Sequence, residues 1–270
     1  RIHRMENVMR ELMLGNKAVA RGMYEAGCKV ISSYPGTPST EITEEAAKYD
    51  EIYCEWAPNE KVAMETAGGA AIAGARSFCG MKHVGLNVAA DPLFTLSYTG
   101  VNAGMVIVVA DDPGMHSSQN EQDSRNYAKA SKIPMLEPAD SQECLAFTKL
   151  AYDISERYDT PVIIRLTTRI SHSRSLVEIG ERVDNGLKGY VKDTQKYVMM
   201  PAMAKKKHVI VEERTKPLEA WGDSEAVDLG VNKIEYNDKK IGIIAGGIAY
   251  QYAKEALGDK ASYLKIGCLY

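Results

Sequence analysis

Paired cysteines are missing from this sequence. It contains five cysteines in 270 residues, and none of them belongs to a C-x-x-C pair. Zinc sites and iron–sulfur clusters are usually marked by such pairs, so the sequence indicates neither. It also has no P-loop, no dinucleotide fingerprint, no G-x-S-x-G elbow and no H-E-x-x-H helix. Any catalytic function must therefore rest on residues that these motifs do not mark.

An excess of charge of one sign is missing as well. There are 33 Lys and Arg residues against 36 Asp and Glu residues, a net charge of -3. This balance gives no electrostatic reason to expect nucleic acid or an anionic membrane as a partner. The one basic run, Lys205–His208, is short, and we interpret it as a solvated loop. No stretch approaches the roughly 20 apolar residues that cross a bilayer, and no signal-peptide pattern is present. We expect a cytoplasmic protein.

Short apolar runs alternate with stretches of helical spacing through the first two thirds of the chain. This alternation is typical of the α/β class, in which helices cover both faces of a parallel sheet. Because the runs are apolar throughout, they predict strands buried inside the sheet. The predicted strands are Lys29–Ser33, Ser77–Met81, Val106–Ala110 and Val162–Leu166. The predicted helices are Asn16–Ala26, Glu41–Tyr49, Glu60–Ala75, Pro92–Gly100 and Ser141–Tyr158.

The composition divides the chain into three parts. Residues 1–180 form the predicted α/β domain. The apolar periodicity then weakens, and we interpret residues 181–239 as an extended linker on the surface. Residues 240–270 begin a second α/β unit with a strand, a Gly-rich turn, a helix and another strand. Such a short unit cannot complete a sheet, so we expect a fragment of a longer polypeptide. The alternative is a shortened product whose tail packs on the first domain.

The first segment that could carry chemistry is Tyr34-Pro35-Gly36-Thr37-Pro38-Ser39, directly after a predicted strand. Ligands of open α/β sheets bind at the carboxyl ends of the strands. Two prolines and a glycine stiffen a loop that presents hydroxyl and backbone N–H groups. The alternative is a rigid turn in which Ser39 or Thr40 caps the next helix.

The second segment is the start of the helix at Glu60. Asn59 can cap this helix, and a carboxylate in the first turn is favoured by the helix dipole, so Glu60 could be purely structural. The helix is rich in Gly and Ala, although Gly costs about 1 kcal/mol relative to Ala. A close neighbour must require these small residues. It could be another helix or a subunit face, and the latter suggests a homodimer.

Two more polar segments, residues 80–92 and 111–125, follow predicted strands. Each of the two histidines in these segments, His83 and His116, could equally have a structural role. Because the carboxyl ends of parallel strands meet at one edge of a sheet, we expect these loops to lie together. The candidates in them are Lys82, His83, Gly85, Asn87 and His116.

Four motifs together resemble the alpha subunits of indolepyruvate:ferredoxin oxidoreductases, within the 2-oxoacid:ferredoxin oxidoreductase superfamily. The resemblance extends from about residue 12 to residue 270, and the order and spacing of the motifs match. It implies a pyrimidine-binding domain for thiamine diphosphate, followed by the start of a transketolase C-terminal-like domain. The motifs are Tyr34–Ser39, Asn59–Ala63, Met81–Asn87 and Asp111–Glu121.

The resemblance also implies roles for individual residues. Glu60 is implied to be the catalytic glutamate that hydrogen-bonds N1' of the aminopyrimidine and so promotes formation of the ylide. Sharing a proton in this way works best when the carboxylate is buried. We expect Glu60 to be exposed in this chain, with burial supplied by a later domain or a partner subunit. The implied cofactor contacts are Pro35, Gly36, Thr37, Glu60, Gly85 and Asn87, and the implied substrate contacts are Thr37, Lys82, His83 and His116.

The implied reaction is the oxidative decarboxylation of indolepyruvate and other aryl 2-oxoacids to aryl-acetyl-CoA, with reduction of ferredoxin. The implied partners are a beta subunit, the remainder of the alpha chain, ferredoxin, the 2-oxoacid and coenzyme A. No metal ligands are predicted in this chain, because it lacks a Gly-Asp-Gly run for Mg²⁺ and a cysteine cluster for [4Fe-4S] centres. We expect the segment to be inactive alone. The alternatives are another 2-oxoacid:ferredoxin oxidoreductase or decarboxylase, and a non-catalytic assembly module.

Overall fold

A six-stranded, fully parallel sheet forms the centre of the protein, in a computed structural model that describes residues 9–268. Residues 1–8 and 269–270, the ends of the first and last predicted units, lie outside the described part. The strand order is β3-β2-β4-β5-β7-β6. All four predicted strands are present within one residue of their predicted bounds. The strands are β2 (Val30–Ser33), β3 (Tyr53–Trp56), β4 (Ser77–Lys82), β5 (Met105–Asp111), β6 (Met135–Leu136) and β7 (Val162–Thr167).

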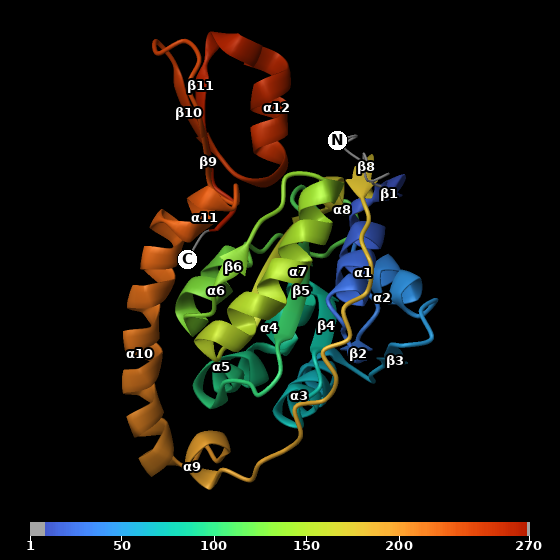
Figure 1. Ribbon diagram of the computed structural model, residues 1–270, viewed down its shortest axis with the longest axis vertical. Coiled ribbons are helices and arrows are strands. Elements are labelled where there is room, and N and C mark those ends of the chain that lie inside the picture. The colour runs from blue at the N-terminus through green and yellow to red at the C-terminus, as the bar shows by residue number, and fades with distance from the viewer. Residues whose placement is uncertain (1–8, 269–270) are drawn as a thin grey trace, which may run out of the picture.

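Helices cover both faces of this sheet, as predicted (Figure 1). The strand β5 shows why, because alternate side chains of a strand point to opposite faces. Val106 and Val108 pack into one apolar cluster, whereas Ile107 and Val109 pack into the other. The first face carries α1 (Gly15–Glu25), α2 (Thr40–Ala46), α7 (Ser141–Tyr158) and α8 (Thr168–His172). The second carries α3 (Glu60–Ile72), α4 (His83–Val88), α5 (Ala90–Thr99) and α6 (Arg125–Ser131).

Four strands of the first domain lie outside the predicted set, among them β3 and β6. The edge strand β3 pairs with β2 but is largely exposed, so its sequence has no apolar run. The other addition is an antiparallel pair of β1 (Arg10–Leu14) and β8 (Arg174–Glu178). Both are short and polar on one side, which is why they carry little signal in the sequence.

The predicted extended linker contains a long helix, so that prediction was wrong in part. Residues 179–193 do run extended along the domain, where Val183 N donates to Glu25 O and Lys188 N donates to Gly74 O. The chain then forms α9 (Thr194–Tyr197), α10 (Pro201–Asp223) and α11 (Glu225–Asp228).

The helix α10 also contains the basic run that we interpreted as a loop. It lies along one side of the main domain (Figure 1). Only Val211, Leu218 and Trp221 are buried in it, so its apolar stripe is too narrow to stand out in the sequence. Arg214 ties it to α5 by donating to the carbonyl of Ser97 at 2.9 Å.

The second unit has the predicted order of strand, helix and strand. β10 (Gly242–Ala245) and β11 (Ser262–Lys265) are parallel, and β9 (Lys233–Glu235) adds an antiparallel edge. Between them lie α12 (Gly247–Leu257) and a 3-10 turn, Gly258–Lys260. This unit meets the first domain where Glu137 N donates to Gly267 O at 2.7 Å. No helix in residues 9–268 is long and apolar enough to cross a membrane.

Candidate functional site

The loops that follow β2, β4 and β5 meet at the carboxyl edge of the sheet, as predicted. Lys82 Nζ, at the end of β4, donates to Ser117 O in the loop after β5 at 2.8 Å. A Cβ built on Gly36 would lie 3.1 Å from Lys82 Cδ, so the loop after β2 packs on the same side chain. Tyr34 N donates to Gly80 O at 3.4 Å. One lysine therefore links three of the four predicted segments.

The loop after β2 is closed by its own hydroxyl groups. Gly36 N donates to Thr40 Oγ1 at 2.9 Å, and Ser39 Oγ donates to Gly36 O at 2.8 Å. The peptide bond between Thr37 and Pro38 is cis. Ser39 makes no side-chain cap to α2, so the interpretation of these hydroxyls as a helix cap does not hold. Among the implied cofactor contacts, Pro35 and Thr37 are exposed on this loop.

Glu60 is buried within this chain, so the expectation that it would be exposed was wrong. Asn59 caps the helix as predicted, accepting from Val62 N at 3.0 Å, and this places Glu60 in the first turn of α3. Only 9% of Glu60 is exposed. The burial comes from α4, because a Cβ on Gly85 would lie 2.6 Å from Glu60 Oε1. No group in residues 9–268 donates a hydrogen bond to this carboxylate.

The short helix α4 holds the other candidates of its segment on different sides. His83 is fully buried, and its Nε2 lies 2.9 Å from Asn120 O. With a proton on Nε2, His83 holds the loop after β5, while its buried Nδ1 has no hydrogen-bond partner in the described part of the chain. Asn87 is exposed and lies two residues after Gly85, on the opposite side of the helix. Its implied contact with the cofactor stays a prediction.

The loop after β5 is ordered around Asp112. Its carboxylate accepts from Ser117 N at 2.7 Å, from Ser118 Oγ at 2.8 Å and from Thr168 Oγ1 at 2.7 Å. Burial acts to raise the pKa of Asp112, but these hydrogen bonds outweigh it and hold the pKa at about 2. The fixed loop carries His116 as an exposed side chain.

A buried network of ion pairs centred on Arg165 lies next to this edge of the sheet. Arg165 Nε lies 2.8 Å from Asp111 Oδ2, and Arg165 Nη1 lies 2.6 Å from Glu137 Oε1. Ser124 N also donates to Asp111, at 3.1 Å. The network therefore joins the ends of β5, β6 and β7 to the end of the Asp112 loop.

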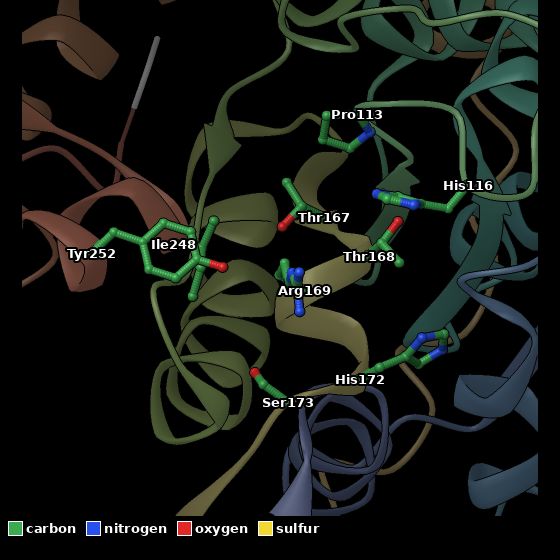
Figure 2. Close-up of a pocket in the computed structure, with 9 residues that line it drawn as sticks. All are labelled: Pro113, His116, Thr167, Thr168, Arg169, His172, Ser173, Ile248 and Tyr252. Atoms are coloured by element: carbon green, nitrogen blue, oxygen red, sulfur yellow. The ribbon is translucent and has the colours of Figure 1, made fainter.

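A cleft of about 680 Å³ opens beside this loop. Figure 2 shows Arg169 and two threonines of the β7–α8 segment between His116 and His172 on one side and Tyr252 on the other. Of the predicted site residues, only His116 lines it. The β7–α8 residues were missed, although the rule that sites form at the carboxyl ends of strands applies to β7 as well. The other lining residues are Pro113, Thr167, Thr168, Ser173 and Ile248.

Comparison with known protein families identifies the family of this chain. Residues 21–235 match the model described as pyruvate flavodoxin/ferredoxin oxidoreductase, thiamine diphosphate-binding. The chain belongs to this family. The match covers the whole parallel sheet and every predicted site residue.

Individual relatives agree with the family. The chain is 45% identical over 265 residues to indolepyruvate oxidoreductase subunit IorA of Methanothermobacter thermautotrophicus, covering 96% of this chain and 43% of that protein. It is 46% identical over 271 residues to the subunit of the same name from Pyrococcus horikoshii, covering 95% and 41%. A 2-oxoglutarate synthase subunit KorA of Methanothermobacter marburgensis is 31% identical over 186 residues, covering 63% and 48%. The chain thus spans less than half the length of these relatives.

A solved structure shares the fold. A 2-oxoglutarate:ferredoxin oxidoreductase from Magnetococcus marinus, with 2-oxoglutarate, coenzyme A and succinyl-CoA bound, matches with a TM-score of 0.76. The match covers 97% of this chain and 54% of that chain, at 18% identity. At this identity the likeness establishes the fold of both units of the chain.

Proposed function

We propose that this chain is the pyrimidine-binding part of a thiamine-diphosphate-dependent oxidoreductase that acts on indolepyruvate and other aryl 2-oxoacids. The products are aryl-acetyl-CoA, carbon dioxide and reduced ferredoxin. One observation carries the proposal: the Glu60 carboxylate is buried against Gly85 and has no hydrogen-bond donor among residues 9–268. The names of the relatives that are 45–46% identical support indolepyruvate as the substrate.

The residues around Glu60 fit the aminopyrimidine of thiamine diphosphate. Glu60 is mostly buried, and no described residue donates a hydrogen bond to its carboxylate, so a donor on a bound molecule can take that place. A ring nitrogen that carries a proton would supply that donor, and Glu60 would hold this proton at N1'. The lack of a side chain at Gly85 makes space for the Glu60 carboxylate, since a Cβ at position 85 would overlap with it. When bound, the cofactor supplies a carbanion and an electron sink for the loss of carbon dioxide.

Other residues of the edge have proposed roles in positioning. Pro35, Gly36 and Thr37 form a loop with fixed backbone N–H and C=O groups next to Lys82, and we assign this loop to the cofactor. Thr37 also faces the substrate in this proposal, together with Lys82 and His116. His83 is too deeply buried to reach a ligand in the cleft, and it contributes by holding the loop that carries His116.

Replacing Glu60 with Gln in the full-length subunit, assembled with its partners, tests the catalytic role. Gln has the same shape but cannot share the proton in the same way, so we expect turnover to fall by roughly 10²-fold or more with the assembly intact. Unchanged turnover would support the alternative of a non-catalytic assembly module. The Gly/Ala helix α3 offers little support for that alternative at Gly68, whose missing Cβ makes room for Leu96 of the same chain.

Substrate profiling tests the aryl assignment. The full-length enzyme should turn over indolepyruvate and phenylpyruvate with a higher kcat/KM than pyruvate or 2-oxoglutarate. A wide preference for either of the small 2-oxoacids would support another member of the family. We further propose a beta subunit, the rest of the alpha chain and ferredoxin as partners, with Mg²⁺ and [4Fe-4S] clusters held outside this chain.

A further inference from the structure

Arg169 brings an unpaired positive charge to the cleft beside the Asp112 loop. Its guanidinium has no carboxylate or hydrogen-bond partner among residues 9–268. Two carboxylates, those of Asp112 and Glu41, contact cleft residues, but neither pairs with Arg169. Asp112 is held by its own loop and by Thr168. Glu41 lies 3.5 Å from His172 Nε2 and accepts from Asn16 Nδ2 at 2.9 Å. The guanidinium of Arg169 is therefore available to pair with an anionic group of a ligand.

A hydroxyl in the cleft lacks a partner as well. Thr167, at the end of β7, is only 7% exposed, and its Oγ1 makes no hydrogen bond to any described residue. Buried hydroxyls are normally hydrogen-bonded, so each exception asks for an explanation. Figure 2 shows Thr167 above Arg169, with Ile248 and Tyr252 on one side and Thr168 and His116 on the other. A polar atom of a bound molecule there would complete its hydrogen bonding.

The wall opposite the histidines is apolar and comes from the second unit. Ile248 and Tyr252 lie one turn apart on α12, and Tyr252 is 55% exposed. A flat ring could stack on this tyrosine, since offset stacking of aromatic groups is favourable. The cleft thus combines one cation, one unpartnered hydroxyl and one aromatic side chain within about 680 Å³, a volume typical of small-molecule sites.

We propose that this cleft binds a ligand that joins an anionic group to a flat ring, with Arg169 at the anion, Thr167 at a polar atom and Tyr252 at the ring. The inference rests on the proposed function, because two of its reactants have this chemistry: an aryl 2-oxoacid and coenzyme A. The position is suitable for either. The cleft opens at the carboxyl ends of β5 and β7, the edge of the sheet at which α3 begins with Glu60, although α8 and α3 cover opposite faces.

The test uses the full-length enzyme with its partner subunits and three variants: Arg169→Gln, Thr167→Val and Arg174→Gln. Arg174 is a matched control, because it is exposed on β8 and does not line the cleft. Calorimetric binding of phenylpyruvate and of ADP is measured for each variant, and neither measurement needs turnover. A failure of the proposed reaction is therefore seen separately, as absent turnover. KM for indolepyruvate and for coenzyme A is measured alongside.

Arg169→Gln should weaken binding of one probe by roughly tenfold to a hundredfold, as expected for a lost hydrogen bond to a charged group. Weaker phenylpyruvate binding identifies the 2-oxoacid as the occupant, and weaker ADP binding identifies coenzyme A. Thr167→Val should weaken the same probe without loss of stability, because it removes a hydroxyl that has no protein partner. Wild-type affinity of both variants for both probes, or an equal loss in Arg174→Gln, would overturn the proposal.

Discussion

Replacing Gly85 with Ala should inactivate the enzyme without destabilising it. The added Cβ would lie 2.6 Å from Glu60 Oε1 and 2.7 Å from Glu60 Cγ. The carboxylate must retreat by about 0.8 Å to restore an ordinary contact of about 3.4 Å. A misplacement of about 1 Å in a catalytic group can cost roughly 10²-fold in rate, and we expect a loss of this order in kcat/KM. The fold should tolerate the change, because Ala favours a helix over Gly by about 1 kcal/mol.

The assay for this variant is turnover of indolepyruvate by the full-length complex, with thermal unfolding measured on the same preparations. Gly69→Ala is the matched control, because a Cβ at Gly69 of α3 meets nothing within 4 Å. This control should keep full activity. If Gly85→Ala is as active as the control, the carboxylate of Glu60 does not need its present position, and the reasoning is refuted.

Two further predictions concern stability. Arg165→Met leaves the buried carboxylates of Asp111 and Glu137 without their cation and should cost about 3–5 kcal/mol in urea unfolding; a loss below about 1 kcal/mol would contradict this. Partial burial acts to raise the pKa of Glu156, but hydrogen bonds, chiefly from Arg76, outweigh it and hold the pKa at about 2, below its ordinary value of 4.5. The stabilisation is therefore present above pH 4.5 and lost as the pH falls toward 2. Glu156→Gln should have a lower Tm than the wild type at pH 7, with the difference vanishing toward pH 2; a difference that does not change with pH would contradict the sign.

The central strands could be predicted because burial on both faces makes them apolar throughout. β5 and β7 are fully buried along their length, and their runs stand out from the polar segments around them. The edge strand β3 was not predictable in this way, because Tyr53 and Trp56 are exposed and no polar–apolar alternation remains. The helix α10 carries Pro217 in its interior and buries only a narrow stripe, so local sequence gives little sign of its length.

The position of the candidate site at the sheet edge was predictable from the sequence, whereas most of its individual contacts were not. The rule for strand ends brought the segments of Gly36, Lys82 and His116 to one edge, and the contacts of Lys82 agree. The burial of Glu60 was not predictable, since it depends on how α4 packs over α3. Arg169 was missed because the segment after β7 has no glycine or proline to mark a loop; its helix starts directly at the strand end.

Glu60 is proposed to bind the pyrimidine of thiamine diphosphate, and the dissociation constant of this cofactor tests that role without any turnover. It is measured by calorimetry on the full-length protein in the presence of Mg²⁺, for the wild type, Glu60→Gln and Glu65→Gln. Glu65 is an exposed acid on the same helix. We predict that Glu60→Gln weakens binding by roughly tenfold or more and that Glu65→Gln leaves it unchanged. Equal affinity of all three proteins would contradict the account.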